Sequence, residues 1–126
     1  MPKEVIYSAN APAPIGPYSQ AIRIGSMLFV SGQIAIQQSS GTIITTTIQE
    51  ETEQVMKNLD EVLRAAGMDF SHIVKTTIFL KDMSNFPKVN EIYGTRFLSQ
   101  PPARETVEVS RLPKDVNVEI SCIAVK

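Results

Sequence analysis

The most informative pattern of the sequence lies near its C-terminal end, in Val116-Asn117-Val118-Glu119-Ile120-Ser121-Cys122-Ile123-Ala124-Val125. Its side chains alternate with a period of two, which is the spacing of a β-strand. One face carries Val116, Val118, Ile120, Cys122 and Ala124, and the other carries Asn117, Glu119, Ser121, Ile123 and Val125. Because both faces hold apolar residues, we expect this strand to lie inside a sheet that is covered on both sides.

Other segments predict further strands of the same sheet. Met27–Val30 is a short apolar run, and Ile34–Ile36 is expected to continue it beyond a bulge at Gly32. Ile73–Leu80 is rich in β-branched residues, and Glu105–Ser110 alternates in the manner of a strand. All of these segments are short enough to be strands of one small sheet.

Two segments predict helices. The first begins at Thr47, which with Glu50 fits a capping box, and ends at Gly67. The second is expected to begin at Ser84 and to end at Pro101-Pro102. The order β-β-α-β-α-β-β predicts an α+β fold, with two helices packed on one face of a mixed sheet in a single domain over residues 1–126.

The opposite face of that sheet has no cover within the chain. The strands expected at 73–80 and 116–125 carry apolar residues on both faces, and two helices can cover only one. A second copy of the chain is the simplest cover. We therefore expect a homo-oligomer with pockets between its subunits.

The composition excludes several classes of protein. Lys and Arg number 12 against 13 Asp and Glu, a formal charge of -1, so nucleic acid is not an expected partner. One His and one Cys cannot supply the three or four ligands of a Cys/His zinc site. No apolar stretch is long enough to span a membrane, and no signal-peptide core follows the N-terminus. We expect a cytoplasmic protein without a metal site.

Two ionisable residues are candidates for chemistry. Arg104 follows Pro102-Ala103, and its guanidinium could clamp a carboxylate through two hydrogen bonds; the alternative is a surface ion pair. Glu119 lies in the middle of the most apolar strand, where a carboxylate must be paired or have a raised pKa. Either condition suits a general base, and the alternative is a solvated glutamate on an edge strand.

Other polar residues have an alternative structural explanation. Tyr18 follows a proline-rich loop and is either a lid or a packed aromatic residue. Asn90 lies near the apolar side of the second helix and either binds a ligand or is a surface residue. The acidic run Glu50-Glu51-x-Glu53 favours the dipole of the first helix, which is sufficient to explain it.

Several short motifs occur together in one order, and their combination is specific. They are Ile15-Gly16-Pro17-Tyr18-Ser19-Gln20-Ala21, Ser31-Gly32-Gln33-Ile34, Val74-Lys75-Thr76-Thr77, Pro102-Ala103-Arg104, Val107-Glu108-Val109-x-x-Leu112-Pro113 and Val118-Glu119-Ile120. With them, nearly the whole chain resembles the reactive intermediate deaminase A family, also called the RidA or YjgF family. The resemblance implies a chorismate-mutase-like fold and a homotrimer with three clefts between its subunits.

The resemblance also implies an activity and a site. Members hydrolyse 2-iminobutanoate, 2-iminopropanoate and their enamine tautomers to 2-oxo acids and ammonia, without a metal or a cofactor. Pyridoxal-phosphate-dependent dehydratases release these substrates. This removal of reactive metabolites is a form of damage control. By the same resemblance, Arg104 would bind the substrate carboxylate and Glu119 would activate the attacking water. The positions that match the family's substrate cleft are Tyr18, Ser31, Gly32 and Asn90.

Two positions depart from the usual pattern of that family. Glu105 stands where many members have a small residue, and Thr106 stands where many have cysteine. In a strand, Thr106 points to the same side as Arg104, so a hydroxyl replaces a thiol in the substrate-binding cleft. Glu105 should point to the opposite face.

Two other functions remain open from the sequence. A non-catalytic trimer could bind 2-oxo acids or amino acids in the same clefts, although such a module would need Arg104 and not Glu119. An endoribonuclease or translation inhibitor is less favoured, because the net charge is -1 and no Lys/Arg cluster is present.

Overall fold

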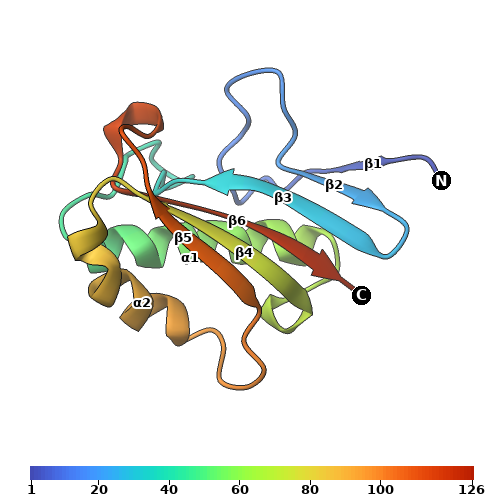
Figure 1. Ribbon diagram of the computed structural model, residues 1–126. Helices are drawn as coiled ribbons and strands as arrows, with labels where there is room; N and C mark the ends of the chain where they lie inside the picture. The colour runs from blue at the N-terminus through green and yellow to red at the C-terminus, as the bar shows by residue number, and fades with distance from the viewer.

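A central strand, β6 (Val118–Val125), organises a six-stranded sheet in the computed structural model, which describes residues 1–126. The strands lie in the order β1-β2-β3-β6-β4-β5, and only β4 and β5 run parallel (Figure 1). The remaining strands are β1 (Glu4–Ile6), β2 (Ala21–Ile24), β3 (Met27–Gln33), β4 (Ile73–Leu80) and β5 (Ala103–Glu108). A parallel pair needs a crossover connection, and the helix α2 (Phe86–Gly94) supplies it.

Both helices pack on one face of the sheet, as predicted, with α1 (Ile48–Ala65) lying along it (Figure 1). A core of 22 buried residues fills the space between the sheet and the segments that pack on this face, the two helices among them. Side chains of β6 alternate between buried and half-buried along its whole length. The fold class predicted from the sequence, α+β with a mixed sheet and two helices, is therefore confirmed.

The first part of the sheet differs from the prediction. β1 and β2 form two strands of an antiparallel meander with β3, and neither was predicted. Ile34–Ile36 is not a strand, because Ile36 makes only an isolated bridge to Ile43. The bulge itself is confirmed, since the register between β3 and β6 shifts between Val30 and Gln33.

The boundaries of α1 match local signals in the sequence. The Thr47 hydroxyl accepts a hydrogen bond from the Glu50 backbone N–H at 3.0 Å, which is the predicted half of a capping box. Past the last turn, Gly67 has a φ of +71°, a conformation that glycine adopts without steric cost. The helix therefore ends where the sequence predicts.

The boundaries of α2 differ from the prediction. Asp82, and not Ser84, provides the first cap: its carboxylate accepts from the Ser84 N–H at 2.9 Å and begins a single 3₁₀ turn. α2 follows this turn and ends at Gly94, seven residues before Pro101. The segment between them is an irregular loop.

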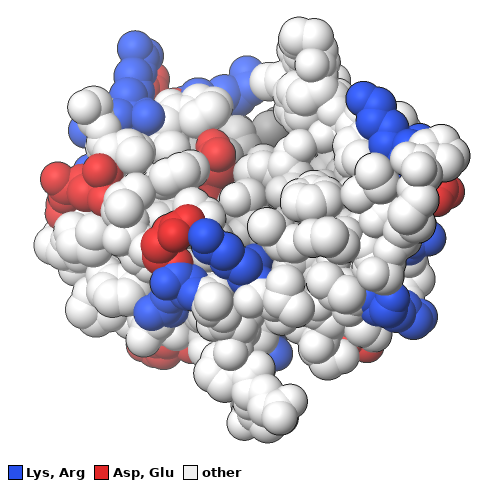
Figure 2. All heavy atoms as spheres, turned by 45° about the vertical axis from the view of Figure 1, so that its right-hand side comes forward, with Lys and Arg blue, Asp and Glu red and all other residues white.

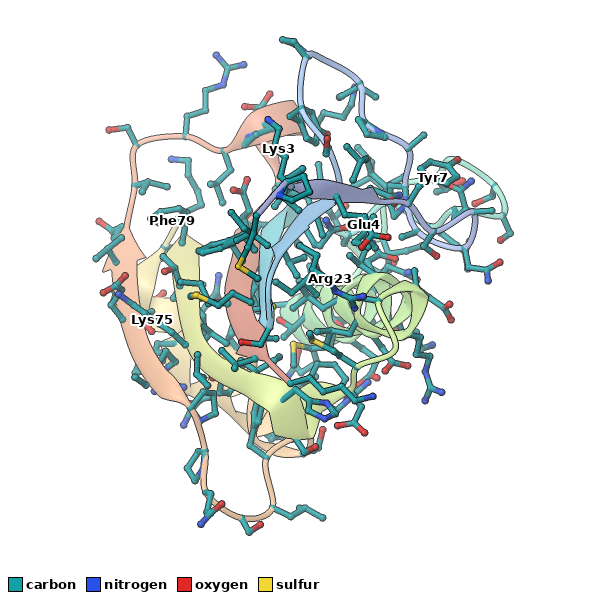
Figure 3. All side chains as sticks on the ribbon, turned by 90° about the vertical axis from the view of Figure 1, so that its right-hand side faces the viewer. Lys3, Glu4, Tyr7, Arg23, Lys75 and Phe79 are labelled. Carbon is teal, nitrogen blue, oxygen red and sulfur yellow. The ribbon has the colours of Figure 1, made fainter.

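The second face of the sheet is open in the single chain. Figure 3 shows Lys75 and Phe79 of β4 projecting away from α1, while Arg23 lies toward the end of that helix. Apolar side chains on the open face remain accessible, with Phe29 41% and Val107 42% exposed. No helix of the structure has the length and apolar character needed to cross a membrane.

Candidate functional site

Glu119 forms the floor of a small cavity on the open face of the sheet. It lies on β6 opposite Phe79 of β4, and it is half-buried. The cavity has a volume of about 80 Å³. Its walls are largely apolar and come from the loop before β2, the loop after β3 and Pro113: Pro12, Ala13, Ile15, Tyr18, Ile34 and Ile36. Burial in these surroundings raises the pKa of the Glu119 carboxyl.

Gly32 makes this position of Glu119 possible. A Cβ atom on Gly32 would lie 2.8 Å from the Glu119 carboxyl carbon and closer still to one of its oxygens. Any side chain at residue 32 would therefore displace the carboxylate. Gly32, which the family resemblance places in the substrate cleft, is therefore needed first to make room for the chain's own Glu119.

A buried amide holds the loop that carries Tyr18. The Gln20 side chain accepts from the Ser8 N–H at 2.6 Å and donates to the carbonyl oxygen of Pro12 at 2.9 Å. The Ser31 hydroxyl, in turn, donates to the carbonyl of Ser19 at 2.6 Å. Tyr18 itself remains 49% exposed at the mouth of the cavity. Ser31 thus fixes the loop, while Tyr18 is free to contact a bound molecule.

Arg104 lies on β5 at a second place, beside α2. Its Nη1 donates to Oδ1 of Asn90 at 2.6 Å. Its guanidinium lies 5.1 Å from the ring centroid of Phe86 and 5.0 Å from that of Tyr93. These contacts orient the cation against aromatic rings and leave most of its donors unused.

Arg104 differs from every other arginine of the chain. The chain has five arginines, and the other four pair with acids: Arg23 with Glu4, Arg64 with Asp60, Arg96 with Glu53 and Arg111 with Asp115. Arg104 has no carboxylate partner, so the surface ion pair considered as its alternative role is absent. A guanidinium with free donors, held by an amide and two rings, is suited to bind a carboxylate from outside.

The Thr106 and Glu105 side chains take opposite directions, as the strand pattern predicts. Glu105 lies on the open face, where it accepts from the Thr77 hydroxyl at 3.0 Å and pairs with Lys75. These partners lower the pKa of Glu105. The Thr106 hydroxyl is buried and has no hydrogen-bond partner within the chain.

The predicted site residues form two groups that do not meet within one chain. Arg104 is in register with Thr76, whose buried hydroxyl contacts the Tyr93 phenol of α2 at 2.8 Å, so Arg104 belongs to the helix side. Glu119 belongs to the open face with Gly32 and Tyr18. The two faces of a sheet alternate residue by residue, and the sheet therefore separates the two groups.

Sequence reasoning missed the residues that support each group. Phe86 and Tyr93 have the spacing of the apolar side of a helix, and that spacing gives no sign of the Arg104 guanidinium that contacts both rings. Ile34 and Ile36 were expected in a strand, whereas they line the cavity beside Glu119. The run Pro12-x-Pro14-x-x-Pro17 was the available signal, since it predicted a stiff loop near Tyr18.

A larger groove lies away from both groups, and its most buried polar side chain already has hydrogen-bond partners within the chain. It has a volume of about 520 Å³ between α1 and the turn at 37–39. Its most buried member, Asn58, already donates to the carbonyl oxygens of Ile34 and Ile36 at 2.9 Å each. No cluster of three or more His, Cys, Asp or Glu side chains is placed to hold a metal ion.

Comparison with known proteins gives consistent matches over nearly the whole chain. The sequence model of the family described as Endoribonuclease L-PSP matches residues 8–126. A RutC family protein of Pyrococcus horikoshii is 52% identical over 98% of both chains. The 2-iminobutanoate/2-iminopropanoate deaminase of Mus musculus is 47% identical over 98% of this chain and 92% of its own. The crystal structure of E. coli TdcF with bound serine has a TM-score of 0.94 and 38% identity, covering 98% of each chain.

Proposed function

Because this chain belongs to the endoribonuclease L-PSP family, which is the YjgF/RidA family, we propose that it is a 2-imino acid deaminase. Its substrates would be 2-iminobutanoate, 2-iminopropanoate and their enamine tautomers, and its products 2-oxo acids and ammonia. The mouse relative's name and a match over the full length support this activity. The serine bound to E. coli TdcF supports a small, carboxylate-bearing ligand.

The single observation that carries the proposal is the unpaired guanidinium of Arg104. It is the one arginine without an acid in the chain, and Asn90 and two rings fix its direction. A 2-imino acid carries a carboxylate directly beside the reacting carbon. Binding that carboxylate would therefore place the C=N carbon at a defined distance from Arg104.

Glu119 would act on the attacking water. Burial raises its pKa, so its carboxylate accepts a proton more readily than a solvated one. As the water oxygen forms a bond to the imine carbon, one water proton passes to Glu119. That proton then goes to the imine nitrogen, which gives a carbinolamine. As the C–N bond breaks, the hydroxyl proton also passes to the nitrogen, so ammonia is released and the 2-oxo acid remains. The reaction consumes one water and needs no redox partner.

The site requires more than one copy of the chain. Arg104 and Glu119 lie on opposite sides of the sheet, so they can face one substrate only if different subunits supply them. The open apolar face offers the surface for such an assembly. We propose a homotrimer in which Arg104 of one subunit faces Glu119 and Tyr18 of another. The enzymes that release the substrate, pyridoxal-phosphate-dependent dehydratases, would act upstream of it.

The test is to follow loss of 2-iminobutanoate and 2-iminopropanoate that a dehydratase generates in the same cuvette. Wild type should accelerate the loss, and Arg104→Ala should not. Arg111→Ala is the matched control, because Arg111 is an exposed arginine whose partner is Asp115. Equal rates for buffer and wild type would refute the deaminase. Binding of serine or a 2-oxo acid without hydrolysis would then favour a non-catalytic binding module.

A further inference from the structure

A fully buried carboxylate on α1 lies behind the candidate base. Glu51 is 0% exposed and lies in the first turn of α1, the helix that covers the sheet. Its Oε2 accepts from the backbone N–H groups of Asn117 at 2.7 Å and of Val118 at 3.2 Å. Its Oε1 accepts from the Asn117 side-chain amide at 2.8 Å. The helix dipole, which explains an exposed acid, does not explain a buried one with three donors.

These donors lie where β6 lacks a neighbour on one side. Pairing between β3 and β6 ends at Gln33 and Ile120, beyond the bulge that brings Gly32 under Glu119. On the other side, the Lys81 N–H donates to the Asn117 carbonyl at 3.0 Å. Glu51 therefore takes the place of a strand at the two residues that immediately precede Glu119. Without it, two backbone N–H groups would lose their hydrogen-bond partner.

We propose that Glu51 is a positioning residue for the Glu119 carboxylate. It does not face the cavity and would not touch substrate. By fixing the backbone at residues 117 and 118, it fixes the direction in which the next side chain leaves β6. Glu119 has little freedom to compensate, because its carboxylate already lies against Gly32. This inference rests on the proposed function for its catalytic consequence, but not for its geometry.

The contacts predict which replacements preserve the arrangement. In Glu51→Gln, the amide oxygen can still accept from both backbone N–H groups. Its NH₂ can donate to Asn117 once that side-chain amide turns over, because an amide has both a donor and an acceptor end. Glu51→Ala removes every one of these acceptors. Glu51→Asp keeps the charge but shortens the side chain, which should draw the acceptors away from β6.

The experiment measures kinetics and the Glu119 carboxyl pKa, the latter by NMR of carboxyl-labelled protein. Glu51→Ala should lower kcat by about 10²-fold, as expected for a displacement of roughly 1 Å at a reacting group. KM, which depends on Arg104, should not change. The pKa of Glu119 should fall toward its ordinary value as the carboxylate leaves its dry position. Glu51→Gln should restore both quantities.

Glu53→Ala is the matched control, because Glu53 is a carboxylate of the same helix that binds Arg96 and not β6. It should leave kcat and the Glu119 pKa as in wild type. If Glu51→Ala fails to fold, Glu51→Asp takes its place and should show the same two changes. A folded Glu51 variant with an unchanged Glu119 pKa would overturn the proposal. Because that readout needs no turnover, it decides the matter even if wild type proves inactive toward imines.

Discussion

Single neighbouring residues determine where the Glu119 carboxylate and the Arg104 guanidinium lie. The carboxylate of Glu119 and the backbone of Gly32 occupy adjacent space with no room for a Cβ. Arg104 has a comparable constraint of a different kind, since an amide and two rings fix it while no acid neutralises it. Glu119 and Arg104 therefore both depend on residues that are distant from them in the sequence.

Substitution of Gly32 by alanine should abolish most of the activity. The added methyl group has to displace the Glu119 carboxylate, so we expect kcat to fall by about 10²-fold. The strain should also lower the free energy of unfolding by about 1–3 kcal/mol. Steady-state kinetics and urea unfolding measure the two effects.

Gly41→Ala separates activity from stability. Gly41 has a φ of +73° and open space around its missing Cβ, so alanine there is strained but remote from Glu119. This variant should lose stability and keep its kcat. If Gly32→Ala were as active as Gly41→Ala, the close contact with Glu119 would have no catalytic importance.

The pH dependence should reflect the raised pKa of Glu119. Water activation needs the ionised carboxylate, so kcat should rise with pH through a value above that of an ordinary glutamate. A kcat–pH profile measures this limb directly. An acid limb at or below the ordinary glutamate pKa would count against Glu119 as the base.

Stability should depend on the same group with the opposite sign. Because burial raises the folded-state pKa of Glu119, the native protein binds this proton more tightly than the unfolded chain does. The contribution of Glu119 to stability is complete below its unfolded pKa and is lost as pH rises through its folded pKa. Glu119→Gln should therefore be more stable than wild type only above that range. Thermal unfolding measured over a range of pH should show the stability difference between Glu119→Gln and wild type appear as pH rises. A difference that stays constant with pH would contradict this prediction.

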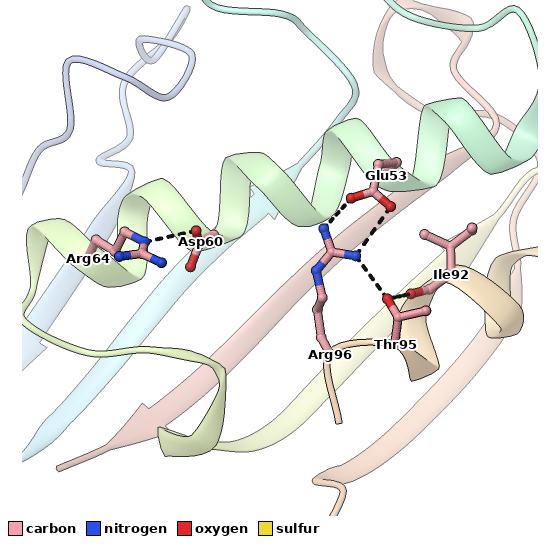
Figure 4. Close-up of polar contacts among 6 residues, drawn as sticks. All are labelled: Glu53, Asp60, Arg64, Ile92, Thr95 and Arg96. Atoms are coloured by element: carbon pink, nitrogen blue, oxygen red, sulfur yellow. Dashed lines mark hydrogen bonds and ion pairs between the residues drawn. The ribbon is translucent and has the colours of Figure 1, made fainter. Parts of the chain in front are cut away.

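At the scale of elements, three acids near the start of α1 have three different surroundings. Glu50 is exposed, Glu51 is buried against β6, and Glu53 pairs with Arg96 beyond α2 (Figure 4). The Arg96 guanidinium also lies 6.0 Å from the ring centroid of Phe70. This pair joins the two helices, and the Arg96 hydrogen bonds hold the pKa of Glu53 below its usual value.

Arg96→Ala should weaken that junction. The side chains of the pair are 22% and 36% exposed, so solvent screens part of their attraction. We expect a loss of about 1 kcal/mol in the free energy of unfolding at neutral pH. The lowered pKa of Glu53 means that this contribution exists above its unfolded pKa and disappears as pH falls through its folded pKa.

Urea unfolding at equal protein concentration measures the difference in unfolding free energy between wild type and Arg96→Ala. It should be done at neutral pH and again at a pH below the folded-state pKa of Glu53. Arg64→Ala is the control, because it removes the exposed pair with Asp60 on the same helix, also drawn in Figure 4, and should change little. A difference for Arg96→Ala that persists at low pH would show that lost packing, and not the charge pair, is responsible.

The elements also show how far a sequence alone predicts this structure. α1 was predicted because its signals, Thr47 and Gly67, are local and adjacent to its ends. β1 is three residues long and was missed, since so short a run has no measurable period. The relation between Arg104 and Glu119 depends on the register of β5 on β4. A slip of one residue would put both on one face, and no local pattern fixes it.

At the scale of the whole molecule, the charge on one face of the surface can be compared with the proposed small-molecule activity. On the face drawn in Figure 2, acidic and basic side chains are scattered and intermixed over an otherwise uncharged surface. Nucleic-acid binding would call for a continuous basic stripe. The open sheet face is instead mostly apolar, with the Lys75–Glu105 pair set within it. We propose that a second copy of the chain covers this face. Its binding would bring Arg104 of one subunit to face Glu119 of another.

Mixing two inactive variants can show whether one site is built from two subunits. Arg104→Ala and Glu119→Gln should each be inactive alone, and hybrids should form when the two are co-expressed or refolded together. If Arg104 and Glu119 of different subunits share each site, random mixing should restore roughly one quarter of wild-type hydrolysis, because each interface receives both intact residues with that frequency. Hybrids that form and remain inactive would contradict a site built between subunits.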